Sequence, residues 1–305
     1  ANTNLLDRTS LRVVKPQSEI DQEKEHYRMM TPEQRYFFDL TGYLHLKSVL
    51  SKEELEPAQQ AADRYISMPP EEWPPEFGAD LERRDLTGYQ HGFAFDKSLE
   101  ILTRHPTTWP ILMELTDRRP RLNGGTLGYN HHRHIFHPLH AGWHPAKRPD
   151  VRRYYIEDDQ VRSTDFIFFF YLSDVFPGDG GLIFLPGSHK AHFDRPQDMF
   201  YPSAYNNEDY VADTVPPGVH NPCPRAGDVI IIPEHLMHGA LTWKPTDRDR
   251  RFLIVRYNVQ HMITGQTRPF PDAIRERLDP ETIDLIELAP YFEYKDIVKK
   301  REGLD

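Results

Sequence analysis

The stretch DFIFFFYLSDVFPGDGGLIFLPG, residues 165–187, decides the fold class. Its apolar run FIFFFYL (166–172) has no polar alternation, which is typical of a strand covered on both faces. This is the longest apolar run in the chain, and it is far shorter than the roughly 20 residues that span a bilayer. The cluster FPGDGG then predicts a turn into a second strand, GGLIFLPG.

Further strand candidates lie on both sides of this stretch. They are RLNGGTLGYNHH (121–132), GDVIIIP (227–233) and RRFLIVRYNV (250–259). No helix of convincing length falls between them, so a doubly wound parallel sheet is disfavoured. Short strands separated by Gly- and Pro-rich turns favour an all-β sandwich or barrel.

The N-terminal part carries helix signals. Thr31, with Glu and Gln residues in the turn that follows, predicts a helix start, and Gly42 predicts its stop. The alternating segment YLHLKSVL (43–50) predicts a strand. Ser51 followed three residues later by Glu54 reads as a capping box that opens a second helix.

Three other segments complete the expected outline. Residues 68–88 are rich in Pro, Gly and Asp and predict a long surface loop. A helix is expected near 97–117, and a closing helix over about 283–300 ends in basic residues suited to a helix C-terminus. The chain therefore reads as mainly β with flanking helices.

Composition limits the function classes. The 305 residues are 38% hydrophobic, enough for the core of one large domain. A net charge of −10 disfavours nucleic acid as a partner. Cys223 is the single cysteine, which excludes an internal disulfide and fits a reducing cytoplasm. The N-terminus lacks the apolar stretch of a signal peptide, so we expect a cytoplasmic protein without a membrane partner.

Two histidines stand out by position. His140 follows an early strand, and His238 follows the strand DVIIIP. In a β barrel, histidines from separate strands can converge with an arginine from a third strand. Imidazoles suit Fe(II) and leave positions open for a co-substrate and O₂. A guanidinium can hold a carboxylate through two hydrogen bonds.

Three segments resemble the phytanoyl-CoA dioxygenase family of Fe(II)/2-oxoglutarate-dependent oxygenases. They are FFDLTGYLHLKSVLSKEEL (37–55), YLSDVFPGDGGLIFLPGSHKAHF (171–193) and AGDVIIIPEHLMHGALTWKPTDRDRRFLIVRY (226–257). The resemblance implies a double-stranded β-helix, the cupin-like jelly roll. It implies His140 and His238 as iron ligands, and an arginine that opens the last strand as the clamp for 2-oxoglutarate.

This resemblance also sets the expected domain and activity. We expect one oxygenase domain over 1–305, made of an arm (1–30), a helical flank (31–120), a jelly-roll core (121–260) and a C-terminal helical extension (261–305). With Fe(II), 2-oxoglutarate and O₂, it would oxidise a C–H bond of a small-molecule substrate, by hydroxylation above all, and release succinate and CO₂.

Two adjacent arginines compete for the clamp. Because a strand alternates its faces, Arg250 and Arg251 point to opposite sides. Counting back from the end of the strand, the arginine of the family falls on Arg250. Arg251 is the alternative if the register slips by one residue.

The iron motif departs from the family pattern. The family has His-x-Asp, whereas this chain has His140-Ala141-Gly142. Fe/2-oxoglutarate halogenases resemble it here, because they replace the Asp so that a halide binds iron. Glu234, four residues before His238, is a carboxylate that could instead complete the site. A non-catalytic jelly-roll binding protein is a further alternative.

More remote acidic candidates also follow the first histidine; they are Asp150, Glu157, Asp158 and Asp159. For the substrate, three residues share one face of the strand that leads toward His140, and we expect them to line the pocket. They are Asn130, His132 and His134.

Overall fold

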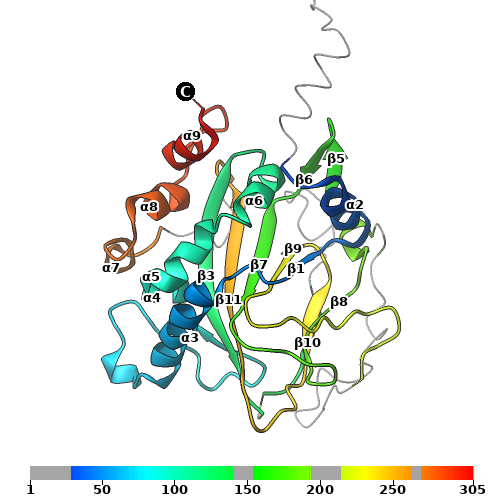
Figure 1. The fold of residues 1–305 in the computed structure, drawn as a ribbon, viewed down its shortest axis with the longest axis vertical. Coiled ribbons are helices and arrows are strands. Elements are labelled where there is room, and N and C mark those ends of the chain that lie inside the picture. The colour runs from blue at the N-terminus through cyan, green and yellow to red at the C-terminus, as the bar shows by residue number, and fades with distance from the viewer. Residues whose placement is uncertain are drawn as a thin grey trace, which may run out of the picture.

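The fold consists of two facing antiparallel sheets with helices packed outside the larger one (Figure 1). It is seen in a computed structural model, which describes residues 29–132, 134–140, 154–191, 193, 214–262 and 269–304. The expectation of a mainly β jelly roll with flanking helices is confirmed.

The larger sheet has six strands. In spatial order they are β1 (Leu44–Leu46), β9 (Val229–Pro233), β7 (Asp165–Tyr171), β11 (Arg250–Val259), β3 (Pro120–Asn130) and β2 (Thr87–Tyr89). The smaller sheet has the order β4 (His137–His140), β10 (His238–Leu241) and β8 (Gly181–Phe184). A two-stranded ribbon pairs β5 (Tyr155–Glu157) with β6 (Gln160–Arg162).

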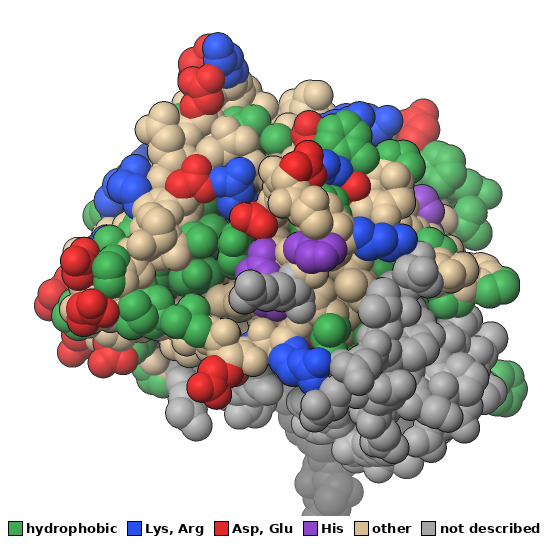
Figure 2. All heavy atoms as spheres, turned by 90° about the horizontal axis from the view of Figure 1, so that it is seen from below, with side chains coloured by type: hydrophobic (Ala, Val, Ile, Leu, Met, Phe, Trp, Pro, Cys, Tyr) green, Lys and Arg blue, Asp and Glu red, His purple; other side chains and the backbone are tan. Residues whose placement is uncertain are grey.

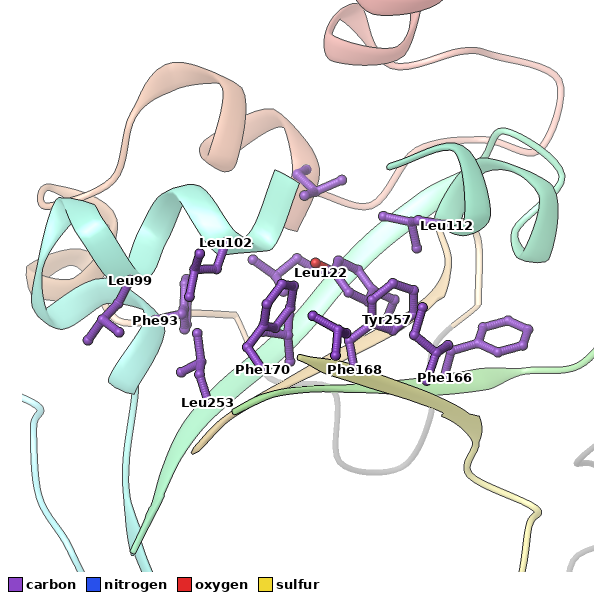
Figure 3. Close-up of a cluster of buried hydrophobic side chains, with 14 of the residues drawn as sticks. Phe93, Leu99, Leu102, Leu112, Leu122, Phe166, Phe168, Phe170, Leu253 and Tyr257 are labelled. Atoms are coloured by element: carbon purple, nitrogen blue, oxygen red, sulfur yellow. The ribbon is translucent and has the colours of Figure 1, made fainter. Parts of the chain in front are cut away.

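Strand β7 is covered on both faces, as its unbroken apolar sequence predicts. Phe166, Phe168 and Phe170 belong to the main core, which lies between the large sheet and the helices (Figure 3). Their neighbours Ile167 and Phe169 belong to a second cluster on the opposite face. This second cluster includes Leu182 and Phe184 of β8, so it fills the space between the two sheets.

The helices are short except for one. They are α2 (Pro32–Thr41), α3 (Lys52–Ser67), η1 (Pro70–Glu72), α4 (Gly92–Phe95), α5 (Lys97–Glu100), η2 (Ile101–Arg104), α6 (Trp109–Leu115), η3 (Ser188–Lys190), α7 (Asp272–Arg275), α8 (Pro280–Ile286) and α9 (Asp296–Glu302). Helices α3 to α6, α8 and α9 lie on the side of the large sheet away from the smaller one (Figure 1).

The predicted helix starts are confirmed. Thr31 and Ser51 each form a complete capping box with the residue three positions on. Gly42 ends α2 in the left-handed conformation, with φ of 82°. A Cβ there would also lie 2.5 Å from Nδ1 of His189, whose Nε2 bonds to the carbonyl of Asp39 in the same helix. His189, from the segment 171–193, therefore holds α2 in place.

Two predictions of a long helix are wrong. The segment 97–117 forms three short helices, and the segment 283–300 is divided between α8 and α9. In the first case His105 precedes a proline, which disfavours helical geometry, and its ψ is 133°. In the second, Glu287 is extended, with ψ of 151°, and Pro290 follows within the break.

The loop expected over 68–88 is largely confirmed, although it contains η1 and runs into β2. Within the part of the chain that the structure describes, no helix has the length and apolar character needed to cross a membrane.

Candidate metal centre

His140 and His238 face each other across adjacent strands. Antiparallel pairing places His238 of β10 directly opposite His140, the last residue of β4. Residues opposed in this way project from the same face, with Cβ atoms about 5 Å apart. The two imidazole centroids are 4.4 Å apart. Two distant segments thus deliver a pair of histidines to one point, as the sequence predicts.

Backbone carbonyls fix the tautomer of both rings. Nδ1 of His140 lies 3.0 Å from the carbonyl oxygen of Pro138, and Nδ1 of His238 lies 2.7 Å from that of Leu236. A carbonyl only accepts, so Nδ1 carries the proton and Nε2 keeps its lone pair. Burial lowers the pKa of His238 to about 3, and partial desolvation lowers that of His140 to about 4 although this residue still reaches solvent. Both rings are neutral at pH 7, which is the form that binds a transition metal.

A β-bulge brings a third histidine to this face. His238 and Ala240 are two residues apart on β10, whereas their partners His140 and His137 are three apart on β4. The extra residue cancels the normal alternation of the strand, which would otherwise turn His137 away. The His137 ring meets the His140 ring edge-on, with centroids 4.4 Å apart, and both line one pocket.

Arg250 lies in the same pocket and is a buried cation with neutral partners. Only 3% of the residue is exposed. One terminal nitrogen donates to Oδ1 of Asn130 at 3.0 Å, the other donates to the hydroxyl of Tyr171 at 3.1 Å, and the guanidinium stacks over the ring of Phe252. Burying a charge on neutral partners is costly. This arrangement therefore favours the arrival of an anion.

Arg251 points to the other face of β11. Its guanidinium forms an ion pair with Asp63 of α3, outside the space between the sheets. The strand register that places Arg250 inward is the one counted from the sequence.

The pocket has a volume of about 250 Å³ and lies between the two sheets. Its floor is apolar, from side chains that include Phe169, Leu182 and Ile254, while its charged lining includes Arg83 and Arg256. Figure 2 shows one face of the molecule on which histidine side chains gather near the centre, with acidic and basic side chains beside them. The pocket thus brings a pair of histidines, a buried cation and apolar side chains together.

The residues predicted to bind substrate have separate positions. Asn130 lines the pocket, but its side chain is engaged with Arg250. His132 bonds to the carbonyl of Lys244, and the buried His134 bonds to the hydroxyl of Thr87. Neither of these histidines is among the residues that line the pocket. The prediction that these three residues share a strand face therefore holds only for Asn130, because β3 ends there.

The structure does not bring Glu234 together with the two histidines. Its carboxylate accepts a hydrogen bond from Arg256 at 2.5 Å, and burial raises its pKa although Arg256 opposes the rise. Among the described residues, no three His, Cys, Asp or Glu side chains form a group that could hold a metal ion. Gly142 and Asp150 lie outside the described residues.

Asp85 is a residue of this site that the sequence did not reveal. It lines the pocket from the loop before β2, within the segment expected to be a surface loop. Burial alone would raise its pKa, but hydrogen bonds from His137 and Arg83 outweigh burial and hold the pKa well below its usual range. A single aspartate in a charge-rich loop carries no sequence signal for such a position.

Comparison with known proteins identifies the family of the chain. The model of the phytanoyl-CoA dioxygenase family matches residues 38–252. The chain belongs to the phytanoyl-CoA dioxygenase family. This family of Fe(II)/2-oxoglutarate-dependent enzymes is the one that the sequence segments resemble. No curated protein matches the sequence.

Solved structures share the fold of this family member. HygX from Streptomyces hygroscopicus, solved with nickel and 2-oxoglutarate, is 24% identical, with a TM-score of 0.59 over 75% of this chain and 87% of HygX. With hygromycin B also bound, HygX aligns at 22% identity and a TM-score of 0.62 over 79% and 95%. The α-ketoglutarate-dependent epimerase SnoN of nogalamycin biosynthesis is 15% identical, with a TM-score of 0.53 over 81% and 85%.

Proposed function

We propose that this protein is an Fe(II)/2-oxoglutarate-dependent oxygenase that oxidises a C–H bond of a small molecule. His140 and His238 are the proposed iron ligands, and Arg250 is the proposed partner of the distal carboxylate of 2-oxoglutarate. The bound iron and 2-oxoglutarate together supply the activation of O₂, with release of succinate and CO₂. Hydroxylation is the outcome that the family resemblance favours.

One observation carries the proposal: the two neutral imidazoles and the buried Arg250 line the same pocket. Each imidazole has its Nδ1 committed to a backbone carbonyl, so Nε2 is the donor offered to a metal. The guanidinium lacks a carboxylate among its hydrogen-bond partners in the described residues. A dicarboxylate fits both features, because one end can chelate a metal held by the two Nε2 atoms while the other end pairs with the guanidinium.

Each side chain then has a physical task. His140 and His238 hold the metal in their neutral forms and need no proton release at pH 7 to do so. Arg250 orients the co-substrate through a charge-assisted contact. The apolar side chains Phe169, Leu182 and Ile254 limit the access of water to the pocket.

Metal binding by defined variants tests the proposal. Equilibrium dialysis against anaerobic Fe(II) should give one iron per wild-type chain and none in the His140→Ala/His238→Ala variant. His132→Ala is the matched control, because it removes a histidine of the same region that bonds to the carbonyl of Lys244. Stoichiometric iron in the double variant, with an intact circular dichroism spectrum, would reject the assignment.

Halogenation is the second candidate, and a specific observation supports it. No third metal-binding side chain joins the two histidines among the described residues, and Glu234 is paired with Arg256. A halide could therefore bind at the third position. A binding protein without metal has no need of two tautomer-fixed histidines beside a buried arginine, so we place that alternative last.

A further inference from the structure

Asp85 is hydrogen-bonded to residues on both sides of the pocket: to His137 beside the histidine pair, and to Asn130 beside Arg250. Its Oδ1 accepts from Nε of Arg83 at 2.6 Å, and its Oδ2 accepts from a terminal nitrogen of the same arginine at 2.9 Å. Oδ2 also receives a hydrogen bond from Nδ1 of His137. This bidentate contact with Arg83 fixes the plane of the carboxylate, so the direction of the His137 bond is fixed as well.

The His137 ring transmits that constraint to a proposed ligand. It stands edge-on to the His140 ring, with an interplanar angle of 84°. On the other side, the His140 ring approaches that of His238. The carbonyl of Pro138 fixes one edge of His140, but a single hydrogen bond leaves the ring free to tilt about it. His137 supplies the second surface.

The backbone of Asp85 contacts the residue that holds Arg250. Its carbonyl oxygen accepts from Nδ2 of Asn130 at 2.7 Å. That bond determines which atom of the amide faces Arg250, because Oδ1 is then left to accept from the guanidinium. Asp85, in the loop before β2, thus orients His137 toward the proposed ligand His140. It also orients the amide of Asn130 toward Arg250.

We infer that Asp85 is a positioning residue of the metal centre, which acts through His137 to hold the His140 ring in its metal-binding orientation. The inference rests on the proposed function, since it takes His140 as a ligand. Removing a carboxylate bonded directly to a ligand histidine lowers metal affinity by about 10- to 100-fold. Asp85 bonds to His137 and not to the proposed ligand itself, so we expect a loss at the lower end of that range.

Cobalt titration of the purified full chain tests this inference. Co(II) binding, followed by its visible absorption, should weaken about 10-fold in Asp85→Ala and comparably in His137→Ala. The Asp85→Ala/His137→Ala variant should bind no more weakly than the weaker single variant, because the carboxylate acts through the imidazole. Thermal unfolding should show that the single variants remain folded.

His137→Phe provides a second test if Asp85→Ala does not fold. Phenylalanine keeps a ring against His140 but loses the bond to Asp85, so cobalt binding should weaken here too. His132→Ala and Asp63→Ala are controls, because His132 contacts the carbonyl of Lys244 and Asp63 pairs with the outward Arg251. Both should bind cobalt as the wild type does.

The outcomes separate this inference from the proposed function. Wild-type cobalt affinity in both Asp85→Ala and His137→Phe would overturn the inference while leaving the two-histidine site intact. Additive losses in the double variant would also overturn it, because Asp85 would then act independently of His137. A wild type that binds no cobalt would instead reject the proposed function.

Discussion

Arg250 and Arg251 are neighbours in the chain, yet their guanidinium groups lie on opposite sides of the large sheet. Arg250 is buried between the sheets with neutral partners, Asn130 and Tyr171. Arg251 forms an ion pair with Asp63 on the helix-covered side. Arg251 is therefore a matched control for Arg250, because the two side chains are chemically identical and only Arg250 lies in the pocket.

The first prediction concerns 2-oxoglutarate binding by these arginines. Arg250→Ala should raise the dissociation constant of 2-oxoglutarate about 10- to 100-fold, because a charge-assisted bidentate contact contributes about 1.5–3 kcal/mol. Calorimetric titration of the anaerobic, metal-loaded protein measures it. Arg251→Ala should bind within about twofold of the wild type. The reverse result would mean that the clamp is Arg251.

The second prediction concerns strand β7, whose two faces lie in different clusters. Phe168→Ala removes a ring from the helix-covered core, and Phe169→Ala removes one from the space between the sheets. Each should lower the free energy of unfolding by about 3–5 kcal/mol, because both leave cavities. Phe292→Ala is the control: its residue is 88% exposed, so the change should stay within about 0.5 kcal/mol.

Urea unfolding followed by circular dichroism measures these differences. A loss below about 1 kcal/mol at either Phe168 or Phe169 would contradict the description of β7 as a strand covered on both faces.

The third prediction concerns pH and a buried lysine. Lys295 is 4% exposed, and its ammonium donates to the carbonyl of Leu285. Burial lowers its pKa to about 7 from 10.5. Between these values the unfolded chain binds the proton and the folded protein does not, so wild-type stability gains from this residue as pH rises from 7 toward 10.5.

The variant Lys295→Met lacks this dependence. The unfolding free energy of the wild type relative to the variant should therefore increase with pH between about 7 and 10, by up to about 1.4 kcal/mol per pH unit. Lys52→Met is the control, because the Lys52 side chain is 77% exposed. A difference between wild type and Lys295→Met that stays constant over this range would rule out the burial effect.

What the sequence predicted well depends on local pattern. The unbroken apolar run of β7 and the capping boxes at Thr31 and Ser51 are properties of neighbouring residues, and the structure has each of them. The inward face of Arg250 also follows from alternation along one strand. Each of these predictions needs no knowledge of which segments meet.

The predictions that failed depend on contacts between distant segments or on single breakers. The helices expected over 97–117 and 283–300 are divided near prolines. Asp85 enters the site because it is hydrogen-bonded to Asn130 and His137, which are distant in the sequence. Position 137 reaches the pocket because of a bulge, which alternation along a strand cannot reveal.

The last prediction concerns the third metal position, which Gly142 cannot fill. In the structure the carboxylate of Glu234 is bound to Arg256, and burial raises its pKa. We therefore expect Glu234→Ala to keep its Fe(II) affinity within about threefold.

We also expect chloride to change the absorption spectrum of the anaerobic wild type loaded with Fe(II) and 2-oxoglutarate, because an exchangeable position accepts a halide. The cation Arg256 lies close enough to lower the pKa of both His140 and His238, so it would favour an anion there. A Glu234→Ala variant that loses most of its iron, with a wild-type spectrum insensitive to chloride, would instead identify Glu234 as the third ligand and show that no halide binds there.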